Sequence, residues 1–557
     1  APQPPTPEEI IMNVRSHTAA PRSRAAILVG LCLAAFIISV DVTIVNVALP
    51  TLVRRLGAST TQLQWIVDAY SLVFAALILA AGSLSDRLGR KGVLLIGLAL
   101  FAVGSLAGAF SGTIPELIAS RAFMGLGAAL MFPSTLSLLV NVFTERGERA
   151  MAIGLWGATT GIGIATGPIV GGWLLERYWW GSIFAFMALV AAGIAALVAV
   201  SVPGSRDPST PPIDWRGLLL SSTGMGVLIF GVIQAPGWGW SSSASLGTIA
   251  GGIALLALFV LIEQRTEHPM LDVGLFRNPR FTAASGSVAI SFFALSGFIF
   301  LVVQYFQFVK GYTPLGTGIR LLPVAGSVAV TSVVGTKLAV RVGNKVIVGA
   351  GLLLFAIGLL WASTASGSTT YLVIVGQMLF LGAGMGLTSA PATEAIMGAV
   401  PAAKAGVGSA VNDATRLFGG TLGVAVIGSV ATSLYTSRLV SELPPGTPGP
   451  ALAGAKGSVG GAIIASHQLS TLGFGPAAHG LAHAATSAFL YSLAGGCRVV
   501  GAVTIVGAVV AIAFLPARPR QPAEMVDETD GLGSLSAPLI AEPASGSAGP
   551  VATTSRP

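Results

Sequence analysis

Residues 26–49 read AILVGLCLAAFIISVDVTIVNVAL, an apolar block interrupted by a single acid, Asp41. A helix of this length rises about 36 Å at 1.5 Å per residue, enough to cross a bilayer core of about 30 Å. A carboxyl group is costly to bury in hydrocarbon, and acids within membrane helices usually belong to functional sites. The block therefore predicts a membrane-spanning helix that carries a functional acid.

The rest of the chain repeats this apolar pattern. Only 9% of its 557 residues are charged, whereas a soluble domain carries about 25%, and the mean hydropathy is +0.81. We predict an all-α membrane protein with about fourteen spans. The expected spans are 26–49, 62–82, 91–111, 114–142, 149–174, 180–202, 216–234, 245–264, 281–308, 315–340, 345–364, 370–398, 405–433 and 485–515.

The distribution of basic residues predicts the orientation. An even number of spans puts both termini on one side, and most Lys and Arg then fall on that side, so we expect both termini in the cytoplasm. The first apolar block shows no cleavage site, and we interpret it as a true span. The N-terminus (1–24) and the tail (516–557) are rich in Pro or in Pro, Ser and Ala, and we expect both to be disordered.

A weak internal repeat divides the chain. Arg87-Leu-Gly-Arg-Lys91 follows the second span, and Arg341-Val-Gly-Asn-Lys345 follows the tenth. Two repeated halves around a central site are a common plan among transporters. The predicted domains are a six-helix bundle over 25–202, two inserted helices with linkers over 203–280, and a second six-helix bundle over 281–515.

The segment 435–484 is predicted to be the longest external loop, because it is rich in Gly, Pro, Ala and Ser. It contains His467, His479 and His483. We expect no metal site there, since histidines in loops are usually solvated.

Three charged residues lie at similar depths in the external half of the first bundle. Asp41 is about 13 Å, and Arg121 and Asp68 about 10 Å, from the external ends of their spans. Burial raises the pKa of a carboxyl group and a nearby guanidinium lowers it, so such a carboxyl can load and release a proton. The alternative is a fixed ion pair that joins helices.

Two acids lie in apolar spans of the second half. Asp413 is followed three residues later by Arg416, so both lie on one helix face. Local pairing and a role in coupling or cation recognition are equally supported. Glu394 follows Pro391 near the internal end of its span, where it could also be interfacial.

The fifth span and the connection between the second and third spans, residues 82–91, both suggest moving parts. Glycines spaced four apart form a groove for a neighbouring helix, and proline removes a backbone donor and can bend the helix. In the connection, an acid can pair with a basic group or cap a helix. The span-five residues are Gly154, Gly163, Gly167, Pro168, Gly171 and Gly172, and the connection residues are Gly82, Asp86, Arg87, Gly89, Arg90 and Lys91.

These motifs resemble the fourteen-helix drug:proton antiporter family of the major facilitator superfamily. The connection pattern, the span-five pattern, the first-span signature Asp41-Val-Thr-Ile-Val-Asn-Val-Ala-Leu-Pro50 and Arg121 with Gly125 and Gly127 occur in the family's order. The resemblance covers nearly all of 25–515. It implies a major facilitator fold and a connection that stabilises the outward-facing state. In the second copy of this connection, which follows the tenth span, Val340 stands where an acid would precede Arg341. We therefore expect only the first copy to act as a latch.

The resemblance implies a proton-coupled exporter of lipophilic, often cationic drugs or dyes. We expect proton coupling at Asp41, Arg121, Asp68 and Asp413, and substrate contacts at these three acids and Glu394. Aromatic residues that could line the cavity or face lipid are Phe36, Phe132, Phe293 and Trp361. The alternatives are export of an endogenous antibiotic, siderophore or lipid, a membrane receptor without transport, and a proton-symport importer.

Enzyme chemistry has no support in the sequence. No Gly-x4-Gly-Lys-Ser/Thr sequence occurs, and no metal-ligand spacing of His and Cys appears. Cys32 and Cys497 fall in apolar blocks, where inert thiols are expected. We therefore expect no cofactor, no metal, no nucleic-acid partner, and a monomer in the cytoplasmic membrane that is driven by the proton gradient.

Overall fold

The computed structural model describes residues 24–205, 214–267, 269, 271–400, 405–443 and 449–515, and these are almost entirely helical. Fourteen of the described helical segments are long and apolar enough to cross a membrane. The prediction of an all-α membrane protein with about fourteen spans is confirmed. The expected disordered ends, 1–24 and 516–557, lie outside the described residues except for Arg24.

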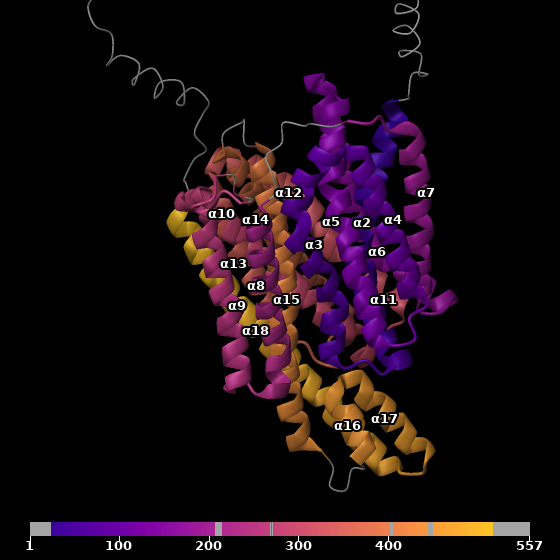
Figure 1. The fold of residues 1–557 in the computed structure, drawn as a ribbon. Helices are drawn as coiled ribbons and strands as arrows, with labels where there is room; N and C mark the ends of the chain where they lie inside the picture. The colour runs from indigo at the N-terminus through magenta and orange to yellow at the C-terminus, as the bar shows by residue number, and fades with distance from the viewer. Residues whose placement is uncertain are drawn as a thin grey trace, which may run out of the picture.

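The helices form two six-span halves with two inserted helices between them (Figure 1). The first half contains α2 (Arg24–Leu56), α3 (Thr60–Leu88), α4 (Arg90–Ala109), α5 (Ile114–Val142), α6 (Arg146–Arg177) and α7 (Ser182–Ser201). The inserted helices are α8 (Trp215–Trp238) and α9 (Ser243–Glu263), followed by the short η1 (Val273–Arg277). The second half contains α10 (Pro279–Gln304), η2 (Tyr305–Val309), α11 (Pro314–Arg320), α12 (Leu322–Val342), α13 (Asn344–Ala362), α14 (Tyr371–Gly398), α15 (Ala405–Glu442) and α18 (Gly475–Phe514).

Helix packing repeats between the two halves. In the first half α2 packs on α6, α3 and α4 pack on α5, and α4 packs on α7. In the second half α10 packs on α15, α12 and α13 pack on α14, and α13 packs on α18, in the same order. The repeated connection has the same form in both halves, because single glycines with positive φ, Gly89 (φ 112°) and Gly343 (φ 99°), join the helices. The weak sequence repeat therefore corresponds to a structural one.

The inserted helices lie at a seam between the halves. Helix α8 packs on α9, and it also contacts α3 of the first half and α15 of the second. The indole of Trp240, in the turn between α8 and α9, donates to Ser433 Oγ on α15 at 2.9 Å. The insertion is thus attached to the transporter core.

The prediction of a loop over 435–484 is wrong. Helix α15 continues to Glu442, α16 (Gly449–Gly457) and α17 (Val459–Thr471) form a helical hairpin, and α18 begins at Gly475. Small residues let these short helices pack closely, and this packing outweighs the composition that suggested a loop. We call the end of the molecule that carries α16 and α17 the hairpin face, and the opposite end, where α2 begins and α18 ends, the terminal face (Figure 1).

Candidate functional site

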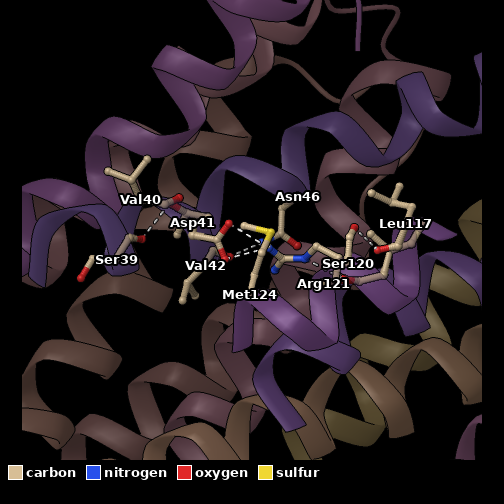
Figure 2. Close-up of polar contacts among 11 residues, drawn as sticks. Ser39, Val40, Asp41, Val42, Asn46, Leu117, Ser120, Arg121 and Met124 are labelled. Carbon is tan, nitrogen blue, oxygen red and sulfur yellow. Dashed lines mark hydrogen bonds and ion pairs between the residues drawn. The ribbon is translucent and has the colours of Figure 1, made fainter. Parts of the chain in front are cut away.

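A buried ion pair joins α2 to α5 in the first half. Nη1 of Arg121 donates to both carboxylate oxygens of Asp41, at 2.8 and 2.7 Å. Figure 2 shows the two side chains pointing toward each other between their helices. Asp41 is 0% and Arg121 2% exposed, so the pair is screened from solvent. Sequence analysis expected both residues at similar depth, and the structure brings them into contact.

The guanidinium of Arg121 has further partners. Nε donates to the backbone carbonyl of Ile66 at 3.1 Å, and the group lies 4.4 Å from the ring centroid of Tyr70. Gly125, one turn after Arg121, lies against the backbone of Tyr70 with no room for a Cβ atom. The glycine of the span-four pattern therefore allows α3 and α5 to approach closely enough for these contacts.

Asp68 is a second buried acid, and its environment differs. Its side chain is fully buried, and neither carboxylate oxygen has a hydrogen-bond partner among the described residues. An unpaired carboxylate in an apolar interior is strongly disfavoured as an ion. Asp68 is thus a buried acid without a hydrogen-bond partner among the described residues, whereas Asp41 is held as half of a pair.

An aromatic row leads away from Arg121 through the first half. The rings of Tyr70 and Phe74 are 5.9 Å apart, those of Phe74 and Phe132 are 5.9 Å apart, and those of Phe132 and Trp156 are 5.2 Å apart. Sequence analysis named Phe132 and missed the other three. The four-residue spacing of Tyr70 and Phe74 on α3 is the signal that could have found part of the row.

The other predicted aromatic contacts are placed differently. Phe36 packs beside Gly163 on α6, and the backbone of Phe293 lies against Gly423 on α15. Trp361 packs within the second half, because its indole lies over Gly376 and 5.7 Å from the ring of Phe380. The structure does not bring Trp361 to the Asp41–Arg121 pair.

The charged residues of the second half form a looser cluster. Arg416 Nη1 lies 3.7 Å from Asp413 Oδ1, and these side chains are 34% and 19% exposed. Arg416 also donates to Thr393 Oγ1 at 3.0 Å, which joins α15 to α14. Glu394 is exposed on α14. Local pairing with Arg416 was one of the two interpretations of Asp413, and this ion pair is present in the structure. Its distance of 3.7 Å is too long for a hydrogen bond.

The glycines of α6 hold the segment of α2 that carries Asp41. Gly163, Gly167 and Gly171 lie against α2 along Phe36–Ile44, with too little space for a Cβ atom. Gly154, nearer the terminal face, has open space around it. The groove predicted for the fifth span therefore exists, and its partner is the helix that carries the acid.

The same helix closes the hairpin face against the second half. Gly172 lies against the backbone of Leu315, and Gly318 lies against Pro168, each with no room for a Cβ atom. A carboxylate oxygen of Glu176 accepts from the Leu315 backbone N–H at 3.1 Å, at the start of α11. Helix α6 thus connects the Asp41 segment to a contact between the halves, and sequence analysis missed Glu176.

The connection 82–91 is shorter than predicted and lies on the terminal face. Helix α3 includes Gly82, Asp86 and Arg87 and runs to Leu88, so Gly89 alone separates it from α4. Asp86 Oδ1 accepts from Arg90 Nε at 2.6 Å and from Ser137 Oγ at 3.0 Å. The expected pairing of Asp86 with a basic group is present.

Two basic groups of this connection, Arg90 and Lys91, also contact the end of α7 and the residues after it. Arg90 Nη1 donates to Ser205 Oγ at 3.2 Å, and Lys91 Nζ donates to the Ala199 carbonyl at 2.7 Å. These contacts all lie within the first half.

Within the part of the chain that the structure describes, no group of three or more His, Cys, Asp or Glu is placed to hold a metal ion.

Sequence comparisons identify relatives of this chain. The Multidrug efflux pump LfrA of Mycolicibacterium smegmatis is 36% identical over 459 residues, covering 82% of this chain and 90% of that protein. The Multidrug resistance protein Stp of Mycobacterium tuberculosis is 37% identical and covers 77% of this chain and 80% of its own. The Tetracenomycin C resistance and export protein of Streptomyces glaucescens is 32% identical, with 89% and 92% covered.

Structural comparison shows the same fold. A bacterial homolog of the human lysosomal transporter Spinster, in an inward-facing and occupied conformation, matches with a TM-score of 0.65 and 16% identity over 90% of this chain and all of that one. A D-xylose–proton symporter matches with a TM-score of 0.56 and 15% identity over 88% of this chain and 98% of its own. Residues 31–424 match the Major Facilitator Superfamily. The chain therefore belongs to the Major Facilitator Superfamily.

Proposed function

We propose that this protein is a proton-coupled antiporter that exports lipophilic, often cationic drugs or dyes. The observation that carries this proposal is the buried Asp41–Arg121 pair, which joins two helices near the middle of the molecule. Relatives that are 36–37% identical are named multidrug efflux and multidrug resistance proteins. Because such a pair is stable only while both groups are charged, protonation of one acid can change how the helices are held.

The proposed orientation in the membrane follows from charge. Lys and Arg accumulate on the terminal face, so this face is placed in the cytoplasm and the hairpin face outside. The protein is proposed to lie in the cytoplasmic membrane as a monomer, because one chain contains both halves. No chemical conversion of the substrate is part of this proposal.

The proposed coupling step uses the two acids of the first half. Protonation of Asp41 removes the charge that Arg121 neutralises, and the Phe36–Ile44 segment of α2 is then free to shift within the glycine groove of α6. Because α6 also contacts Leu315 of the second half, that shift reaches the hairpin face. Asp68, buried and without a hydrogen-bond partner among the described residues, is the second proton carrier.

The proposed substrate class follows from the surroundings of the pair. Aromatic rings bind planar apolar groups, and carboxylates attract cations. The row from Tyr70 to Trp156 offers such rings beside the Arg121 guanidinium, which binds Asp41. Membrane lipids, protons and small lipophilic cations are the proposed partners.

A second candidate is export of one endogenous antibiotic. The relative that covers 89% of this chain is named for tetracenomycin C resistance and export, and a 35% identical relative of Streptomyces coelicolor is named for methylenomycin A resistance. A dedicated exporter would use the same pair but would be selective for one compound.

Ethidium efflux in energised inverted vesicles tests the proposal. We expect the wild-type protein to accumulate ethidium in the vesicles, and we expect a protonophore or Asp41→Asn to abolish accumulation. Folded wild-type protein that moves neither ethidium nor other lipophilic cations would contradict the broad substrate range and favour the dedicated exporter. Transport that persists in the presence of the protonophore would contradict proton coupling.

A further inference from the structure

A buried glutamine of the first half is bonded to the second half near the hairpin face. Gln64 on α3 is 0% exposed. Its amide Nε2 lies 3.3 Å from the carbonyl of Val424, 2.9 Å from that of Ala425 and 3.2 Å from Ser429 Oγ, all on α15. The amide therefore joins α3 of the first half to α15 of the second half.

A second buried glutamine makes the reciprocal contact. Gln307, 3% exposed, lies in η2, a π-helical turn at the end of the first span of the second half. Its Nε2 donates to the backbone carbonyl of Val47 on α2 at 2.9 Å. Irregular turns of this kind occur at functional sites, because they redirect side chains without ending the helix. Each half thus donates a hydrogen bond from one side-chain amide to the backbone of the other half.

The surroundings show how closely the first contact is fitted. A Cβ atom on Gly428 of α15 would lie 2.6 Å from Nε2 of Gln64, so glycine is needed for the amide to enter. The Oε1 atoms of Gln64 and Gln307 are both buried without a hydrogen-bond partner among the described residues. The oxygen of each amide therefore lacks a hydrogen bond to the described residues, and this limits how much each contact stabilises the closed arrangement.

Two other buried glutamines serve as an internal comparison. Gln304 Nε2 donates to the Phe300 carbonyl of its own helix at 3.1 Å, and Gln377 Nε2 donates to the Trp361 carbonyl within the second half at 3.1 Å. They are 1% and 3% exposed. Burial of a glutamine is thus common in this half, whereas the bonding of Gln64 and Gln307 crosses between halves.

We propose that Gln64 and Gln307 form a two-point amide latch that holds the hairpin face closed and releases when that face opens. A neutral amide suits this task, since its donors and the backbone carbonyls gain water when the halves part, and no buried charge is left behind. The latch rests on the proposed function, because an exporter must open its external face to release a substrate, but it does not depend on which acid carries the proton. Gln64 and Gln307 are positioning residues: they act on the equilibrium between the two states.

Distance measurements between spin labels test the latch. Labels are attached to cysteines at Phe110 and Thr364, which are exposed in turns of the first and second half on the hairpin face, after Cys32 and Cys497 are replaced by alanine. Pulsed electron paramagnetic resonance on the purified protein in nanodiscs, without a proton gradient, then reports the separated population. We expect Gln64→Leu and Gln307→Leu each to raise the ratio of separated to closed molecules about fivefold, and the double variant to raise it further.

The matched controls are Gln304→Leu and Gln377→Leu, which make the same change where no hydrogen bond crosses between halves. Both are expected to leave the distance distribution unchanged. Gly428→Ala provides a second route, because the added methyl group displaces the Gln64 amide without removing it, and we expect the same shift. An unchanged distribution in the folded latch variants, or an equal shift in the controls, would overturn the latch. If the distances shift in the latch variants as expected but the wild-type protein shows no proton-driven transport, the proposed function is contradicted and the latch stands.

Discussion

The two halves each contain an Asp–Arg pair, and the pairs differ in every physical respect. Asp41 and Arg121 come from different helices, lie within 2.7 Å and are almost completely buried. Asp413 and Arg416 are three residues apart on one helix, lie 3.7 Å apart and are partly exposed. The first pair therefore holds two helices in one arrangement, whereas the second pair lies within a single helix.

This difference predicts where coupling takes place. Breaking a buried pair by removing one partner costs about 3–5 kcal/mol, because the remaining charge has no compensation. An exposed pair contributes about 0–1 kcal/mol. Repeated helix packing thus does not make the two Asp–Arg pairs equivalent in structure, and the predictions below test whether the halves also differ in function.

The largest effect is expected from Asp41→Asn. The variant leaves the Arg121 guanidinium buried beside a neutral amide, so we expect active ethidium transport to fall by more than about a hundredfold. Efflux in inverted vesicles measures this effect, with Arg121→Ala expected to behave alike. If Asp41→Asn transports normally, the pair is only structural and the comparison between the halves fails.

A smaller effect is expected from Asp68→Asn. Since neither oxygen of Asp68 has a hydrogen-bond partner among the described residues, an isosteric neutral amide should not lower stability. We expect proton-driven transport to fall about tenfold while the melting temperature of the purified protein stays the same or rises. A clear fall in melting temperature would show that the ionised carboxylate stabilises the fold.

The glycine groove of α6 gives the third prediction. Gly167→Ala forces a methyl group against Thr43 and Val40, next to Asp41, and overpacking of this kind costs about 1–3 kcal/mol. We expect transport to fall several-fold. The control is Gly154→Ala, where open space and the helix propensity of alanine predict normal transport and equal or higher stability. Equal effects at both positions would mean that the groove does not act on the pair.

The smallest effect is expected from Asp413→Asn. Its partner Arg416 remains bonded to Thr393, so the guanidinium keeps a hydrogen-bond partner when the carboxylate is replaced. We expect ethidium transport within about threefold of wild type. A loss as large as that of Asp41→Asn would assign the second half an equal share in coupling.

Much of the fold follows from the sequence, because apolar blocks of span length have few other solutions in a membrane. Span 114–142 agrees with α5 at both ends, and Asp41 and Arg121 were expected at similar depths in the first bundle. Which acid pairs with Arg121 did not follow, because Asp68 was expected at the same depth as Arg121 and the structure leaves it without a hydrogen-bond partner among the described residues.

Side-chain direction and close packing could not be derived in the same way. An apolar span does not show which face meets a partner, so Trp361 was a candidate for the cavity although it packs within the second half. Gln64 and Gln307 stand near span ends, where a polar side chain suggests an interface with water. Their role depends on the approach of the other half, which no local pattern encodes.

The most direct test of the central claim measures protons. Proteoliposomes containing the purified protein and a trapped pH-sensitive dye receive an inward ethidium gradient, and the release of protons from the lumen is recorded. The account predicts proton release by the wild-type protein and by Asp413→Asn, and none by Asp41→Asn. Proton release by Asp41→Asn at the wild-type rate would contradict the assignment of coupling to the buried pair of the first half.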